Sequence, residues 1–274
     1  MQHTVFGKEV NMKKIKIIAM DFDGTLLTSD KKITERTKKT IINLKNKSYI
    51  IVGVTARNLL SARSVLDVNL FDYIILNNGS NIYYVKEDRI ENISSMENET
   101  VEKIYNLFSN HAYQIDFCTP YMYLIKAKEK NDNRSVVKYI DDLGDVDSSV
   151  SRMNIFFENE KDLEANRHLL EKEFNNINVV KMVDTDDKNS RMWLTVNPKN
   201  ANKLTTLKKI CNDLKKSIEE VIFFGDGEND LVLIENAGIG VAMANAIEIV
   251  KEKATFVTSS NDNDGIAEYL EKNI

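Results

Sequence analysis

The feature that most constrains the fold is a series of short, nearly continuous apolar runs separated by amphipathic stretches. Ile15 to Met20, Ile50 to Val54 and Tyr73 to Leu76 are such runs, and each indicates a strand buried on both faces, as in a parallel sheet covered by helices. Helical patterns from Glu35 to about Lys47 and from Asn58 to about Leu66 lie between them. This alternation predicts right-handed βαβ units.

The pattern changes after Asn77-Asn78-Gly79, where the expected strands become amphipathic or aromatic and charged helical stretches separate them. Such strands favour an open antiparallel sheet with helices on one face. We therefore expect a second domain inserted into the first. Its expected strands are Ala112 to Phe117, Tyr121 to Ala127, Met153 to Phe157 and Arg191 to Val196.

The buried-strand pattern returns near the end of the chain, so the first domain is expected to be discontinuous. It would comprise residues 12–81 and 198–274, and the insert residues 82–197. The expected elements of the second segment are a strand at Val221 to Phe224, a helix from about Asp230, a strand at Gly238 to Val241, a helix near Ala246 to Lys253, a strand at Thr255 to Thr258 and a final helix.

Composition excludes several classes of protein. The chain has 274 residues, 42% of them hydrophobic, and a formal net charge of -5; it can bury a core, and it offers no basic stripe that could follow a nucleic-acid backbone. Cys118 and Cys211 lack neighbours for a zinc site or a disulfide framework, which favours the reducing cytoplasm. No apolar run approaches the roughly 20 residues of a membrane helix, so we expect no membrane partner.

The first polar motif, Asp21-Phe22-Asp23-Gly24-Thr25, follows the first buried strand directly. It therefore lies at the carboxyl edge of the sheet, where open α/β folds bind ligands. Residues i and i+2 of an extended chain point to the same side, so Asp21 and Asp23 can face one pocket. Two such carboxylates differ in protonation, so one can act as nucleophile and metal ligand while the other carries a proton.

Other interpretations of this motif are a calcium loop and an ordinary acidic turn. The calcium loop fails on spacing, because an EF-hand needs glycine at its sixth position and glutamate at its twelfth. Here Gly24 is fourth, and Leu26-Leu27 follow. An acidic turn stays possible from the pentapeptide alone.

The second strand ends in Val54-Thr55-Ala56-Arg57. A hydroxyl followed by backbone N–H groups at the start of a helix suits an anionic oxygen. By itself Thr55 is more typical of a helix cap.

Carboxylates also follow the returning strand, in Gly225-Asp226-Gly227-Glu228-Asn229-Asp230. Asp226 could join Asp21 around one Mg²⁺, which prefers about six oxygen ligands. Asp230 could cap the next helix and also orient the metal ligands. Lys203, at the start of the helix that leads back to the core, could neutralise phosphate charge, although a lone lysine is more often solvated.

Taken in order, Asp-x-Asp-Gly-Thr, a Thr at a strand end, Lys203 and Gly-Asp-x-x-x-Asp resemble the four motifs of the haloacid dehalogenase-like hydrolases, in particular the Cof-type phosphatases. The resemblance covers nearly the whole chain. It extends to Asn78-Gly79, Gly240-Val241-Ala242-Met243, Asn245-Ala246 and Asp264-Gly265.

This resemblance implies a Rossmann-like parallel-sheet core with helices on both faces, an inserted α/β cap domain with an antiparallel sheet, and a Mg²⁺-dependent phosphatase. Asp21 would be the nucleophile and a metal ligand. Asp23 would be the general acid/base and lend its backbone carbonyl to the metal. Asp226 would be the third ligand, supported by Asp230. The phosphate would be held by Thr55, Lys203, Asn229 and the backbone N–H groups of Phe22 and Ala56.

Two positions depart from the family pattern. Thr55-Ala56-Arg57 stands where the family usually has Thr-Gly-Arg, and Leu204 stands where a glycine commonly follows the motif lysine. A methyl group at residue 56 leaves its N–H available, so phosphate binding should survive. The larger Leu204 side chain would change how a substrate approaches at this position.

The expected substrates are small phosphomonoesters such as sugar phosphates, because the large insert could roof the site and because its Tyr, Asn, Arg and Lys content suits hydroxyl-rich ligands. We expect a monomer or weak homodimer and no nucleic-acid partner. Two alternatives remain: a sugar-phosphate mutase or phosphotransferase on the same core, and a non-catalytic phospho-acceptor like a receiver domain. Rapid release of phosphate would separate the phosphatase from both.

Overall fold

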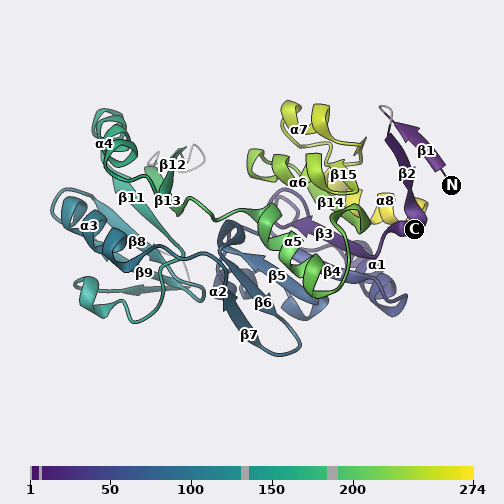
Figure 1. The fold of residues 1–274 in the computed structure, drawn as a ribbon, viewed down its shortest axis with the longest axis horizontal. Coiled ribbons are helices and arrows are strands. Elements are labelled where there is room, and N and C mark those ends of the chain that lie inside the picture. Colours follow the sequence, from purple (N-terminus) through teal and green to yellow (C-terminus); the bar gives the residue numbers. More distant parts are fainter. Residues whose placement is uncertain (1, 6–7, 131–135, 184–190) are drawn as a thin grey trace. The chain divides into compact units, whose positions relative to one another are not determined.

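The computed structural model describes residues 2–5, 8–130, 136–183 and 191–274. Two compact units are formed (Figure 1). The first comprises Met1–Ala56, Val65–Glu91 and Asn202–Ile274, and the second comprises Arg57–Ser64 and Asn92–Ala201.

The first unit is built on an eight-stranded sheet with the order β16-β15-β14-β3-β4-β5-β6-β7. Strand β3 (Ile17–Asp21) lies between β14 (Val221–Gly225) and β4 (Ile50–Val54), and both pairings are parallel. All five residues of β3 are buried, as the apolar run predicts for a central strand. The other strands are β5 (Tyr73–Leu76), β6 (Asn81–Tyr84), β7 (Arg89–Asn92), β15 (Ile239–Ala242) and β16 (Phe256–Val257).

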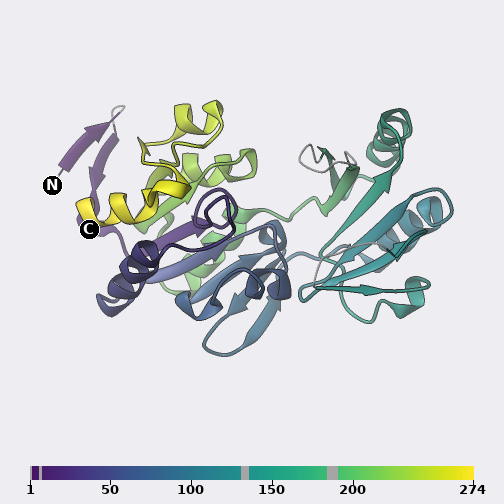
Figure 2. The same ribbon diagram turned by 180° about the vertical axis from the view of Figure 1, so that it is seen from behind.

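Helices cover both faces of this sheet. Figure 2 shows α1 (Glu35–Asn46) and α8 (Gly265–Asn273) on one side, and Figure 1 shows α5 (Lys203–Asp213) and α6 (Leu231–Asn236) on the other. Helix α7 (Glu248–Lys253) packs against α6. Helix α1 begins where a cap is available, because the Thr34 side chain accepts a hydrogen bond from the Thr37 N–H.

The second unit contains a six-stranded sheet with the order β10-β9-β8-β11-β13-β12. Its pairings are antiparallel except for β9 with β10. Alternate residues of its strands form a core with helices α3 (Asn98–Phe108) and α4 (Glu160–Glu173); Phe117, Ile155 and Leu194 are among them. The strands are β8 (Gln114–Cys118), β9 (Tyr123–Ala127), β10 (Val137–Tyr139), β11 (Arg152–Phe157), β12 (Ile177–Val183) and β13 (Met192–Pro198).

The remaining elements of the described chain are short. Strands β1 (Gln2–Val5) and β2 (Lys8–Asn11) form an antiparallel pair. Helix α2 (Leu59–Arg63) is grouped with the second unit, where the N–H of Leu59 donates to the Pro120 carbonyl. The 3₁₀ turns are Met12–Lys14, Val68–Leu70, Asn77–Gly79, Leu143–Asp145, Ile218–Glu220, Glu228–Asp230 and Asn261–Asn263.

The expected fold class is confirmed: a mainly parallel core sheet is interrupted by an insert with a largely antiparallel sheet. The compact units differ from the expected boundaries in three places. Residues 82–91 continue the core sheet as β6 and β7, and residues 57–64 and 198–201 are grouped with the second unit. Strand β6 returns antiparallel to β5 after the turn at Asn77–Gly79. Its partner β7 is a partly exposed edge strand, and such a strand looks alike in sequence whichever sheet it joins, so the pattern could not assign this hairpin.

None of the helices in the described part of the chain combines the length and the apolar character that a membrane crossing requires.

The sheet brings Gly53 of β4 against the aromatic ring of Phe22, which follows β3. A Cβ atom at position 53 would lie 2.7 Å from a carbon of that ring. The ring is fully buried, with its centroid 5.3 Å from that of Phe71. Glycine in this strand therefore reflects close packing beside the residue after Asp21.

We expect Gly53→Ala to lower the free energy of unfolding by about 1–3 kcal/mol, because the added methyl group overpacks a buried site. Urea denaturation followed by circular dichroism measures the change. In the double variant Phe22→Leu/Gly53→Ala the smaller leucine side chain leaves room for the added methyl group. The free energy of unfolding should therefore fall by less than the sum of the two single changes. Simple additivity would show that the Phe22 ring is not the obstacle.

Candidate active site

The centre of the candidate site is Asp21, the last residue of β3. Its side chain is almost fully buried, with a relative exposure of 7% for the residue. The neighbouring strands β14 and β4 also end at this edge of the sheet, because all three are parallel. Parallel pairing therefore brings Asp21 together with the polar segments that follow β14 and β4.

A buried lysine bridges two carboxylates in this site. The Lys203 Nζ lies 3.0 Å from Asp21 Oδ1 and 2.7 Å from Asp230 Oδ1. Lys203 is the first residue of α5, and the residue is only 3% exposed. The solvated lysine that is the commoner alternative is therefore not what the structure contains.

Burial alone would lower the pKa of Lys203, but the adjacent carboxylates of Asp21 and Asp230 raise it above its ordinary value. The ammonium group is thus held in its charged form. It provides one positive charge among several acidic groups.

Asp230 braces the loop after β14. Its Oδ2 accepts hydrogen bonds from the backbone N–H groups of Asp226, at 3.1 Å, and Gly227, at 3.2 Å. Its side chain does not cap helix α6, so of the two roles considered for it, the structure supports the one directed at the loop. Gly225 permits this packing, because a Cβ atom there would lie 2.7 Å from that of Asp230.

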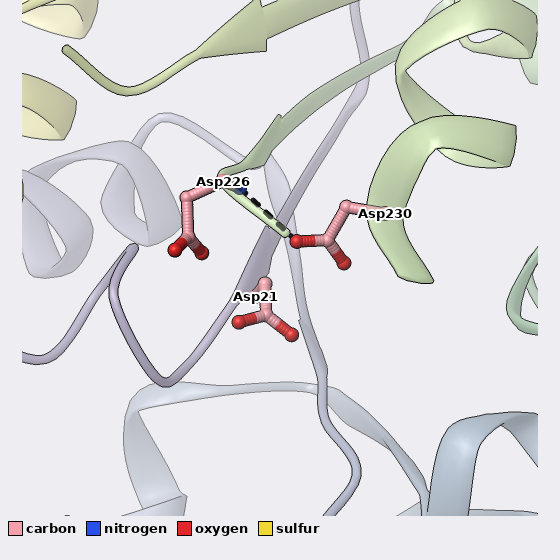
Figure 3. Close-up of side chains that lie close together, drawn as sticks. All are labelled: Asp21, Asp226 and Asp230. Atoms are coloured by element: carbon pink, nitrogen blue, oxygen red, sulfur yellow. Dashed lines mark hydrogen bonds between the residues drawn. The ribbon is translucent and has the colours of Figure 1, made fainter. Parts of the chain in front are cut away.

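Three carboxyl groups gather at this edge, as Figure 3 shows for Asp21, Asp226 and Asp230. One oxygen of each lies within 4.8 Å of the others. Asp226 Oδ1 also accepts a hydrogen bond of 2.7 Å from Thr25 Oγ1. The chain approaches closely at Gly24, where φ is +80° and a Cβ atom would lie 2.3 Å from Asp226 Oδ2.

This donor set fits a hard divalent cation. Burial and the charge on Asp230 raise the pKa of Asp21 well above its usual range, although Lys203 opposes them. Burial likewise raises the pKa of Asp226, and the hydrogen bond from Thr25 opposes the change. Three carboxylates face a single ammonium group, so a cation with oxygen preference, such as Mg²⁺, would balance the charge.

Asp23 is not one of the three clustered carboxyl groups. Its Oδ1 forms an ion pair of 2.9 Å with Lys31 Nζ, and its side chain is 38% exposed. The sequence predicted that Asp21 and Asp23 face one pocket; the structure turns the Asp23 carboxylate to Lys31, whose own φ of 59° lies in the left-handed region. The role predicted for Asp23 stays a prediction.

The predicted phosphate-binding residues occupy two different environments. Thr55 is buried directly after β4, and its carbonyl accepts a hydrogen bond of 3.1 Å from the Asn78 N–H. It does not cap α2, because Asn58 does so. Asn229 is exposed, and its side-chain amide lies 3.5 Å from Asn78 Oδ1. Ala56 follows Thr55 and is half-buried.

The sequence pattern assigns no role to two residues that contact the predicted site residues, Thr25 and Asn78. Thr25 donates to Asp226, and Asn78 contacts Thr55 and Asn229. The sequence signal for both was present, because each stands in a Gly-containing turn at a strand end.

Comparison with known proteins gives an independent view of the chain. The profile of the family described as haloacid dehalogenase-like hydrolase matches residues 18–270. The chain is 28% identical over 257 residues to the 5-amino-6-(5-phospho-D-ribitylamino)uracil phosphatase YcsE of Bacillus subtilis, covering 93% of this chain and 94% of the relative. It is 30% identical over 274 residues to the phosphatase YitU of the same organism, which carries the same substrate name, covering 93% and 96%.

A solved structure agrees over the same extent. The crystal structure of a haloacid dehalogenase-like hydrolase from Bacteroides thetaiotaomicron superimposes with a TM-score of 0.81 at 28% identity, covering 95% of this chain and 100% of that one.

We expect Lys203→Met to lower the free energy of unfolding at neutral pH by about 3–5 kcal/mol, because it leaves Asp21 and Asp230 buried without their cation. The loss should shrink on acidification. Without Lys203 the folded-state pKa of Asp21 rises further above its unfolded value of about 3.9, and stability falls as pH increases between these two values.

Chemical denaturation in EDTA at several pH values measures this effect. Lys209→Met is the matched control: Lys209 also contacts two carboxylates, Glu91 and Asp213, but is 36% exposed and should contribute less than about 1 kcal/mol. Equal losses in the two variants would contradict the burial argument.

Proposed function

The chain belongs to the haloacid dehalogenase-like hydrolase family, and we propose that it is a phosphatase that hydrolyses small phosphorylated metabolites through a phospho-aspartate on Asp21. The observation that carries this proposal is the pairing of buried Asp21 with the charged Lys203 at 3.0 Å. A carboxylate held between a fixed cation and further acidic groups is oriented to attack a phosphoryl group.

The proposed substrate class is the phosphate monoesters of sugars, polyols and related metabolites. Support comes from the names of the two Bacillus subtilis relatives, whose stated substrate carries its phosphate on a ribityl chain. The second unit, residues 57–64 and 92–201, is proposed as the cap that recognises the rest of such a substrate, and the first unit as the catalytic core. The Tyr, Asn, Arg and Lys residues of the proposed cap supply hydrogen-bond donors and acceptors for hydroxyl groups.

Magnesium is the proposed cofactor. Asp21, Asp226 and the backbone carbonyl of Asp23 would hold the ion, and Asp230 would keep the Asp226 loop in place through its two backbone hydrogen bonds. When bound, Mg²⁺ would offset the negative charge of the phosphoryl oxygens.

The proposed reaction has two halves. A carboxylate oxygen of Asp21 attacks phosphorus, the bond from phosphorus to the ester oxygen breaks, and Asp23 gives its proton to the departing alkoxide. In the second half Asp23 removes a proton from water. The water oxygen then bonds to phosphorus, the acyl phosphate bond breaks, and inorganic phosphate leaves with Asp21 restored.

Two groups of residues would serve these steps. Lys203, Thr55, Asn229 and the N–H groups of Phe22 and Ala56 are proposed to hold the phosphoryl oxygens, with Lys203 already fixed by its carboxylate contacts. Asp23 would have to exchange its ion pair with Lys31 for a contact with the leaving group. Its side chain is 38% exposed, so the exchange would not require a buried group to move.

We expect Asp21→Asn to abolish release of phosphate in the presence of Mg²⁺, because the amide cannot attack phosphorus. Asp23→Asn should lower kcat by about 10²–10⁴-fold for an alkyl ester and for an aryl ester, because the second half-reaction needs Asp23 as a base for both. With the aryl ester, whose leaving group needs no proton, the first half should still be fast and give a burst of the alcohol before slow release of phosphate. Pre-steady-state release of the alcohol, compared with release of phosphate, separates the two roles. Near wild-type turnover by Asp21→Asn would refute the nucleophile assignment.

We expect hexose and pentitol phosphates to give kcat/KM at least about tenfold above a phosphopeptide, a difference of about 1.4 kcal/mol in transition-state binding. Kinetics on a panel of sugar phosphates, nucleotides, phosphorylated cofactors and a phosphopeptide measure this. A preference for the phosphopeptide would overturn the substrate class, and phosphoryl transfer to a sugar hydroxyl in place of water would indicate a phosphotransferase.

A further inference from the structure

The turn Asn77–Gly79, between β5 and β6, touches three segments that carry predicted phosphate-binding residues. The Asn78 N–H donates to the Thr55 carbonyl at 3.1 Å. The Asn78 side chain accepts from the Asn229 amide at 3.5 Å. The Gly79 carbonyl accepts a hydrogen bond of 2.6 Å from Thr206 Oγ1, which comes from helix α5.

The backbone of this turn adopts a conformation that few residues accept. Three consecutive residues have positive φ: 49° at Asn77, 56° at Asn78 and 103° at Gly79. Asparagine and glycine are the residues that enter this region most readily. Such a conformation persists only where the surrounding structure fixes it, and at Gly79 the hydrogen bond from Thr206 of α5 contributes to this.

Gly79 lies directly against the start of α5. A Cβ atom at position 79 would lie 2.5 Å from the Asn202 carbonyl carbon and 2.7 Å from the Lys203 backbone nitrogen. Both are main-chain atoms, so they cannot move aside without moving the helix. Glycine at 79 is therefore what lets the backbone of Lys203 come this close to the core sheet.

Thr206 lies one helical turn after Lys203 and is only 1% exposed. Asn202 caps the helix, because its Oδ1 accepts from the N–H groups of Leu204 and Thr205. This cap forms hydrogen bonds within the first turn of α5 and does not connect that turn to the sheet. The hydrogen bond from Thr206 to the Gly79 carbonyl makes this connection, because it joins α5 to the turn after β5.

We propose that Gly79 and Thr206 are positioning residues, which dock the first turn of α5 on the Asn77–Gly79 turn and so place the Lys203 ammonium between Asp21 and Asp230. The effect of these two residues on catalysis rests on the proposed function, in which Lys203 binds the phosphoryl group. Functional groups act only when held within about 0.5 Å of their productive geometry. A Cβ atom at residue 79 could be accommodated only by moving these main-chain atoms of Asn202 and Lys203, and the Lys203 side chain would move with them.

The test compares Thr206→Val, which removes the hydroxyl and keeps the shape, with Thr206→Ser, which keeps the hydroxyl. We expect Thr206→Val to lower kcat/KM by about tenfold and Thr206→Ser to stay within about twofold of wild type. Gly79→Ala should lower kcat/KM more than Thr206→Val does. Gly238→Ala is the matched control, because its Cβ would lie 2.1 Å from the Glu219 carbonyl oxygen, in a clash that does not involve α5.

Two further readouts separate positioning from general loss of stability. In a double-mutant cycle on kcat/KM, adding Thr206→Val to Lys203→Met should lower kcat/KM much less than Thr206→Val lowers it in the wild-type protein. The reason is that Thr206 acts through the position of Lys203. Reductive methylation of the folded protein, read by mass spectrometry, should leave Lys203 protected in wild type, Thr206→Ser and Gly238→Ala. It should modify Lys203 more extensively in Thr206→Val and Gly79→Ala, while labelling of the exposed Lys31 stays unchanged.

Additive effects in the cycle, or unchanged protection of Lys203 in Thr206→Val and Gly79→Ala, would overturn the proposal. The labelling readout does not depend on catalysis. Failure of every phosphate ester to react would therefore refute the proposed function, and the placement of Lys203 would still be decided by its protection.

Discussion

The arrangement of the site depends on one buried ammonium group held between two buried carboxylates. Lys203 contacts Asp21 and Asp230 at 3.0 and 2.7 Å, in surroundings from which water is nearly excluded. Charges taken out of water are costly to bury unless each has a partner of good geometry. The lysine therefore fixes the positions of the nucleophile candidate and of the residue that braces the loop after β14.

This interaction also leaves an imbalance of charge. Asp226 adds a third carboxylate within 4.8 Å, and its burial raises its pKa. Among the residues that the structure describes, Lys203 supplies one positive charge to the cluster, where three carboxyl groups meet. A divalent cation bound by these carboxyl groups would offset the imbalance, and the same cation would serve a phosphoryl group approaching Asp21.

The sequence predicted the sheet edge well because its signals are local. A buried run that ends in Asp21 and another that ends in Gly225-Asp226 must meet if the strands are parallel, and they do. The burial of Lys203 was not predictable from its neighbours, because it depends on how closely α5 approaches the turn at Gly79. The ion pair of Asp23 with Lys31 depends in the same way on a left-handed residue in a loop, for which alternation along a strand gives no information.

The central claim is that phosphorus becomes bonded to Asp21. Rapid quenching during turnover with Mg²⁺, followed by reduction with borohydride, converts an aspartyl phosphate to homoserine, which peptide mass spectrometry locates. The account predicts homoserine at position 21 in the wild-type protein. It predicts a larger amount in Asp23→Asn with an aryl phosphate, because the second half-reaction of this variant is slowed. Homoserine at another aspartate, or steady turnover with no modified residue at any quench time, would contradict it.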